Sequence, residues 1–174
     1  MRAAVLLFWL MLVVPGAQAA DWLAWRKVGD ATLTWGPFTV YTSQLRTPDG
    51  RYSRDDQDQA LIITYARDID RDELVEATRD QWQAQGILTQ EPQSEAWLRM
   101  LQSLWPDVRP GSQLAFVLND KQGQFWYRAS SAQKSFIPLS PRQSEAFSTR
   151  FLAIWLDPRT QYPELRQQLI GGKK

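Results

Sequence analysis

Histidine and cysteine are both absent from this chain of 174 residues, and each absence excludes a class of chemistry. Without histidine the protein has no Ser-His-Asp triad, no histidine-ligated zinc and no imidazole general base. Without cysteine it has no thiol nucleophile, no thiolate metal site and no disulfide. We therefore expect no metal site and no cofactor, and a fold that depends on its hydrophobic core alone.

The first residues of the chain have the pattern of a secretory signal peptide. Arg2 is the only charge before a long apolar run, and Ala17 and Ala19 put small residues where a signal peptidase needs them. The apolar run is short for a membrane span, which favours cleavage after Ala19 over a membrane anchor. We expect residues 1–19 to be a signal peptide and residues 20–174 to be one periplasmic domain without an integral membrane span.

Charge is almost balanced, with 20 basic and 19 acidic side chains. Loss of Arg2 with the signal leaves 19 of each sign, whereas nucleic-acid binding needs a clustered excess of basic side chains. The acidic loop around Asp55, Asp56 and Asp58 lacks the residue order of a calcium-binding loop. The sequence therefore predicts no nucleic-acid partner and no calcium site, and it leaves any protein partner unknown.

Tryptophan is unusually abundant, with nine in the chain. Those beyond the predicted signal are Trp22, Trp25, Trp35, Trp82, Trp97, Trp105, Trp126 and Trp155. Either these rings fill the core, or some of them line a pocket for a flat or long apolar ligand. The sequence leaves both interpretations open.

Two periodicities predict the order of elements along the chain. Runs rich in threonine, valine and aromatic residues predict strands over residues 22–28, 31–35, 38–45 and 60–67, and a hairpin over 113–118 and 124–129. Apolar residues spaced by three or four predict helices from the cap Asp70 to Gly86, over 94–105, from the cap Ser140 to Asp157, and from Pro163 to Gly171. Glu73 lies three residues after Asp70, which is the spacing of a capping box. This order predicts an α+β fold with an antiparallel sheet.

Charged side chains of the first helix, including Asp72, Glu76, Arg79 and Asp80, are expected to form a solvated surface.

Two arginines next to apolar segments are candidate anion ligands. Arg67 follows a strand that contains Tyr65, and Arg150 precedes Phe151 in an apolar helix. A guanidinium in an apolar cavity would bind a carboxylate or a developing oxyanion, whereas one at the surface would reach solvent or pair with a neighbouring acid. The hydroxyls of Thr39, Tyr41, Tyr65 and Tyr127 could add neutral donors to such a cavity.

Four segments together resemble the exported bacterial chalcone isomerase-like proteins. They are VYTSQLRTPDGRY over 40–52, LIITYARDIDRDELVEATRDQW over 61–82, LWPDVRPG over 104–111 and FLAIWLDPRTQYPELRQQLIG over 151–171. The resemblance covers nearly all of the chain beyond the signal. It implies an open-faced β-sandwich, in which helices cover one side of a large antiparallel sheet and a ligand cleft lies between the two layers.

The resemblance also implies a mechanism, in which a cleft arginine holds an attacking phenolate while a strand threonine and a helix tyrosine polarise a ketone. Thr39 matches the strand threonine. The segment GDATLTW over 29–35 has no arginine, and DRDELVEAT over 70–78 has no tyrosine. The arginine and tyrosine that hold a carboxylate in fatty-acid-binding relatives are absent as well.

We therefore expect a non-catalytic domain that binds a small apolar or amphipathic ligand between sheet and helices. The alternative is an isomerase or lyase that acts on a phenolic enone, with Thr39, Tyr65 and Arg67 as candidate catalytic residues. The candidate ligand-binding residues are Tyr41, Trp82, Trp126, Arg150 and Trp155. A second alternative is an interaction module for another envelope protein, whose docking surface would be the 94–105 helix if its Trp97–Trp105 stripe is only half covered.

Overall fold

One antiparallel sheet of six strands, in chain order from β1 to β6, is the centre of the fold. The computed structural model describes residues 21–172, so the predicted signal peptide lies outside the described residues. The strands are β1 (Arg26–Trp35), β2 (Phe38–Thr47), β3 (Gln59–Tyr65), β4 (Gln113–Asn119), β5 (Gln122–Arg128) and β6 (Ile137–Pro138). Each strand pairs with the next, so every connection is a hairpin or a longer antiparallel return.

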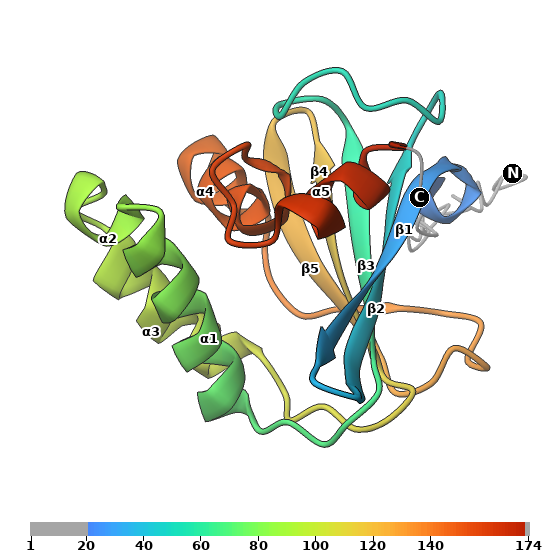
Figure 1. Ribbon diagram of the computed structural model, residues 1–174, viewed down its shortest axis with the longest axis horizontal. Coiled ribbons are helices and arrows are strands. Elements are labelled where there is room, and N and C mark those ends of the chain that lie inside the picture. The colour runs from blue at the N-terminus through green and yellow to red at the C-terminus, as the bar shows by residue number, and fades with distance from the viewer. Residues whose placement is uncertain (1–20, 173–174) are drawn as a thin grey trace, which may run out of the picture.

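Helices cover one face of this sheet (Figure 1). The short 3-10 helix η1 (Asp21–Ala24) precedes β1, and the α-helices are α1 (Arg71–Ala84), α2 (Ile87–Gln90), α3 (Ser94–Leu104), α4 (Glu145–Leu156) and α5 (Pro163–Leu169). Figure 1 shows α4 and α5 over the sheet, and α1, α2 and α3 grouped beside them. The predicted α+β class with an antiparallel sheet covered by helices is confirmed.

The start of α1 follows the predicted capping box. The Asp70 carboxylate accepts a hydrogen bond from the Glu73 backbone N–H at 2.9 Å, and the Glu73 carboxylate accepts one from the Asp70 N–H at 3.4 Å. Gly86 follows the end of the helix with a φ of 75°, a left-handed conformation that glycine adopts without steric cost.

The start of α4 lies four residues later than predicted. Ser144, not Ser140, is the cap, because its hydroxyl accepts the Phe147 N–H at 3.2 Å. The Ser140 hydroxyl instead accepts the Phe125 N–H at 3.1 Å and donates to the Pro141 carbonyl at 2.8 Å. Both serines have cap-like sequences, and the pairing of Ser140 with β5 decides between them.

A single long strand, β1, replaces the two strands predicted over 22–28 and 31–35, and residues 22–24 belong to the 3-10 helix η1 instead of a strand. The glycine between the two predicted strands, Gly29, does not mark a turn. It lies against α5, where an added Cβ would come within 2.1 Å of the Gln168 carbonyl oxygen. This glycine therefore allows close approach of two backbones inside a continuous strand.

Phenylalanine rings hold α4 on the sheet. Phe116 of β4 and Phe125 of β5 lie 4.7 Å apart between ring centroids, and Phe151 of α4 lies 4.9 and 5.0 Å from them. Phe147 stacks on Phe151 at 5.8 Å. Such edge-to-face and offset contacts add about 0.5–1.5 kcal/mol each beyond the area that they bury.

A second, smaller apolar cluster lies on the other face of the sheet. Trp22, Phe136 and Trp126 meet there, with Trp22 buried between the other two rings. Beyond this cluster the second face of the sheet carries mainly polar side chains. Within residues 21–172, no helix is both long and apolar enough to cross a membrane.

Replacement of Gly123 by alanine tests the packing of α4 on the sheet. The Gly123 N–H donates to the Ser148 hydroxyl at 2.9 Å, and an added Cβ would lie 2.0 Å from the Phe116 ring. We expect Gly123→Ala to lower the free energy of unfolding by about 1–3 kcal/mol, measured by chemical denaturation. The neighbouring exposed control, Gln122→Ala, should stay within about 0.5 kcal/mol of wild type, and equal stabilities for the two variants would contradict this packing.

Candidate functional site

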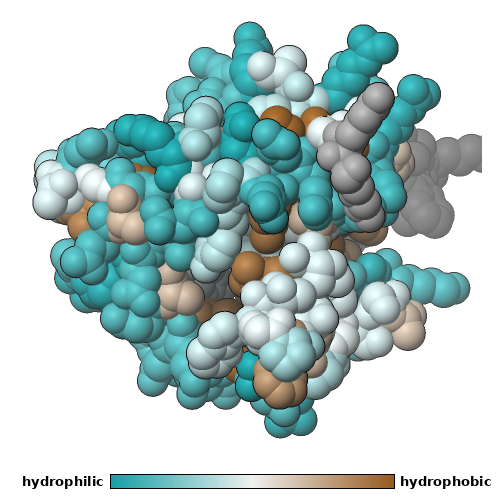
Figure 2. All heavy atoms as spheres, in the orientation of Figure 1, coloured by the Kyte–Doolittle hydropathy of each residue, from teal (hydrophilic) through white to brown (hydrophobic). Residues whose placement is uncertain are grey.

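An apolar cavity of about 290 Å³ lies between the sheet and the helices α1 and α4. It opens to solvent, and Figure 2 shows apolar atoms at the bottom of a hollow between the α1 side and the β1–β2 hairpin. Its volume is close to the lower end of the range found for small-molecule sites, about 300–1,000 Å³.

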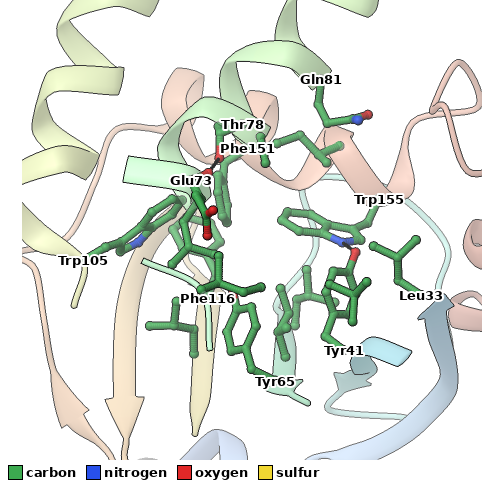
Figure 3. A pocket seen from close by; sticks show the side chains of 18 of the residues that line it. Leu33, Tyr41, Tyr65, Glu73, Thr78, Gln81, Trp105, Phe116, Phe151 and Trp155 are labelled. Atoms are coloured by element: carbon green, nitrogen blue, oxygen red, sulfur yellow. Dashed lines mark hydrogen bonds between the residues drawn. The ribbon is translucent and has the colours of Figure 1, made fainter. Parts of the chain in front are cut away.

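Side chains at alternate positions of the strands form the floor of the cavity, because alternate residues of a strand point to the same face of the sheet. Leu61, Ile63 and Tyr65 of β3 line it at every second position, and Tyr41 of β2 pairs with Tyr65 in register. Side chains that recur every three or four residues on one side of a helix form the other walls. They are Leu74, Ala77, Thr78 and Gln81 of α1, and Phe151, Ile154 and Trp155 of α4. Figure 3 shows these walls facing one another.

Tyr41 and Trp155 join the floor to α4 through a hydrogen bond. The Trp155 indole N–H donates to the Tyr41 hydroxyl oxygen at 2.9 Å (Figure 3). Because an indole N–H is only a donor, the phenolic proton of Tyr41 stays free to donate to another group. Burial raises the pKa of Tyr41 above its usual value of 10, so this hydroxyl is neutral at physiological pH.

Tyr65 is a buried polar group of the cavity floor. Its side chain is 6% exposed, and its ring meets that of Tyr41 edge-on at 6.2 Å. Among residues 21–172 its hydroxyl has no hydrogen-bond partner. Burial raises the pKa of Tyr65 as well, so the cavity presents two neutral phenols that can donate hydrogen bonds.

The mouth of the cavity is acidic. Glu73 and Asp80, both exposed residues of α1, contribute to its lining, and Figure 3 shows Glu73 beside Trp105. No lysine or arginine of residues 21–172 lines the cavity. A ligand carboxylate would therefore meet like charge at the entrance and no cation inside, whereas a neutral ligand that accepts a hydrogen bond meets the two phenols.

Three of the residues singled out from the sequence meet in this cavity: Tyr41, Tyr65 and Trp155. Thr39 and Arg67 do not line it. Thr39 is exposed near the tip of the β1–β2 hairpin, and the exposed Arg67 lies over the Phe38 ring at 6.0 Å. The β2–β3 register explains this result, since both residues lie beyond the Tyr41–Tyr65 pair.

Trp82, Trp126 and Arg150 also lie outside the cavity lining. Trp82 is fully buried in the core, where its indole N–H donates to the Arg150 carbonyl at 3.0 Å. Trp126 lies on the opposite face of the sheet, next to Trp22. The Arg150 guanidinium forms an ion pair with Glu91 at 3.0 Å. Five of the eight tryptophans among residues 21–172 are buried, and two of these five, Trp105 and Trp155, also line the cavity.

Sequence reasoning missed the polar side of α1. Glu73 was recognised only as part of the cap, and Asp80 only as part of a solvated surface, yet both reach the mouth of the cavity. Helical spacing was the available signal, because Glu73, Ala77 and Asp80 lie on the same side of a helix. Nothing in the sequence showed that this side faces a hollow instead of open solvent.

The 94–105 helix does not offer the half-covered stripe that a docking surface would need. Trp97 and Trp105 are 7% and 5% exposed. The large apolar side chains that are exposed among residues 21–172 lie elsewhere, and they are Trp35, Phe38 and Ile137.

Comparison with known proteins finds a relative without an assigned function. No family model matches the chain. An uncharacterized protein of Haemophilus influenzae is 26% identical over 157 residues, which cover 90% of this chain and 73% of that protein. The similarity therefore extends over the strands and helices that form the cavity, and it carries no functional name.

Ionisation of the buried phenols predicts a loss of stability in alkali. Because burial raises the pKa of Tyr65 in the folded state, the unfolded state releases this proton first as the pH rises above about 10. The stabilisation is thus fully present below that pH and declines above it, by about 1.4 kcal/mol per pH unit for each such tyrosine.

Above a pH of about 10, we expect the unfolding free energy of Tyr65→Phe to decline less steeply than that of wild type, by about 1.4 kcal/mol per pH unit. The measurement is a denaturant titration at several pH values. Phe116→Leu is the matched control, since it alters the same cavity without removing an ionisable group. An unchanged slope in Tyr65→Phe would show that Tyr65 ionises as freely in the folded state as in the unfolded chain.

Proposed function

We propose that this protein is an exported, non-catalytic domain of the chalcone isomerase-like type that binds a small apolar or amphipathic ligand between its sheet and its helices. The observation that carries the proposal is the cavity of about 290 Å³, with apolar walls and two buried neutral phenols. The segments that resemble the family over 40–52 and 61–82 include α1 and most of β2 and β3, which form much of the cavity wall.

The energetics of the cavity favour an occupant. At about 24 cal/mol per Å³, a sealed void of 290 Å³ would cost about 7 kcal/mol, which is comparable to the whole stability of a domain. The opening to solvent lowers this cost by admitting water, but water has few hydrogen-bond partners against apolar walls. An apolar ligand gains free energy when it replaces that water, because its own surface leaves solvent at the same time.

The placement of charge favours binding over catalysis. Stabilisation of a developing oxyanion uses a cation or several aligned donors at the reacting atom. Arg67 and Arg150 lie outside the cavity lining, and the neutral phenols have raised pKa values that make them poor bases at physiological pH. Hydrogen bonding to a neutral polar group is the chemistry that these residues support best.

A substitution at the entrance tests ligand binding directly. Ala77 is exposed on α1 and lines the cavity, so a large side chain there would occupy its mouth. We expect Ala77→Trp to weaken binding of the neutral fluorescent probe N-phenylnaphthylamine by about tenfold or more. The measurement is a fluorescence titration, supported by native mass spectrometry of protein purified from the periplasm.

Gln83→Trp is the control, because Gln83 is exposed on the same helix but does not line the cavity. It should bind the probe like wild type. A wild-type protein that neither binds the probe nor carries a ligand after purification would refute the proposal, and so would equal losses in the two tryptophan variants.

A phenolic enone isomerase is the second candidate, favoured by the position of the Tyr65 hydroxyl next to Tyr41 on the cavity floor. In this case the protein would accelerate the loss of absorbance of a hydroxychalcone, and Tyr65→Phe would slow that reaction by about tenfold or more through loss of a donor to the ketone. Arg67→Ala and Thr39→Val should have little effect, because neither side chain lines the cavity. A strong loss of this activity in either variant would instead show that the reaction depends on Thr39 or Arg67, as predicted from the sequence.

A further inference from the structure

The face of the sheet opposite α1 and α4 contains a second hollow, of about 440 Å³, with mainly polar walls. A row of side chains runs across it in register: Thr32 of β1, Thr42 of β2, Thr64 of β3, Gln113 of β4 and Arg128 of β5. Thr42 and Thr64 alternate with Tyr41 and Tyr65, so this hollow lies on the opposite side of the sheet from the apolar cavity.

In the part of the chain that the structure describes, the two arginines of this hollow donate hydrogen bonds only to neutral acceptors. Arg46 donates to the side-chain oxygen of Gln44 at 2.6 Å and to the Leu23 carbonyl at 2.5 Å. Arg128 donates to the side-chain oxygen of Gln113 at 2.5 Å and to the Gln133 carbonyl at 2.7 Å. Within residues 21–172, the Nη2 atom of each guanidinium makes no hydrogen bond, and it carries two further N–H donors.

These hydrogen bonds orient the two side chains without cancelling their charge. Among residues 21–172, neither Arg46 nor Arg128 has a carboxylate within ion-pair distance. Asp30 contributes a carboxylate to the wall of the hollow, and it is paired with Lys27 at 2.8 Å. Burial, and after it the positive charge of Arg46, lowers the pKa of Arg128.

We propose that Arg46 and Arg128 form a binding site for an oxyanion of the phosphate type on the open face of the sheet. Two partly buried guanidiniums that line the same hollow match such an anion in charge, and threonine hydroxyls of the central row add neutral donors. The site is independent of the apolar cavity, because it uses the opposite face of the sheet. Binding would remove the repulsion between the two arginines and would therefore stabilise the fold.

Pyrophosphate is a suitable probe, since it carries several oxyanion charges in a small volume. We expect pyrophosphate to raise the melting temperature of the full chain above its value in sodium chloride of equal ionic strength, with a measurable heat of binding in isothermal titration calorimetry. Arg128→Gln and Arg46→Gln should each weaken this binding by about tenfold or more. Arg79→Gln is the control, because Arg79 lies on α1 and pairs with Glu95.

A third variant keeps the test valid if loss of an arginine unfolds the chain. Thr42→Glu places a carboxylate in the hollow without removing a hydrogen bond to Leu23 or Gln133. It should abolish pyrophosphate binding and raise the melting temperature in anion-free buffer, whereas Thr34→Glu, at the hairpin tip, should do neither. The proposal is overturned if pyrophosphate stabilises wild type no more than sodium chloride does, or if Thr42→Glu binds it like wild type.

Discussion

The packing of α4 between the sheet and α1 is the constraint on which the rest of the structure depends. Phe147 and Phe151 hold α4 against the rings of β4 and β5. On its other side, backbone carbonyls of α4 accept hydrogen bonds from Trp82 and Gln85 of α1. The helix thus acts as a spacer: α1 rests on α4, and the space between α1 and the strands of the sheet remains open as the cavity.

The two faces of the same strands have opposite electrostatic character. One face, under α1 and α4, offers apolar walls, neutral phenols and a mouth with Glu73 and Asp80. The other offers threonine hydroxyls, amides and two arginines without acidic partners among residues 21–172. Because alternate residues of a strand point to opposite faces, one set of strands supports an apolar site and a polar site without conflict. The apolar cavity and the polar hollow are therefore separated by the thickness of the sheet.

Local chemistry made much of the fold predictable. The capping box at Asp70, the helical stripe of α3 and the alternation of β3 depend on residues close together in the sequence, and each lies where the pattern placed it. Predictions were wrong where a distant partner decided the outcome. Ser140 does not cap α4, because its hydroxyl accepts a hydrogen bond from the Phe125 N–H. Gly29 lies inside a strand, at a point where α5 approaches the backbone closely. A residue's own neighbours in sequence carry no information about such contacts.

For the candidate site too, some features follow from the sequence and others only from the tertiary structure. By itself the sequence determined the residue chemistry, namely the absence of histidine and cysteine, the supply of aromatic rings and the strand that carries Tyr65. Only the tertiary structure decided which of these groups meet: it brought Tyr41 and Trp155 together across 114 positions and left Thr39 and Arg67 outside the cavity. The physical reason is that a cavity is the space left between packed elements, so its position depends on how helices and strands pack and not on any single segment.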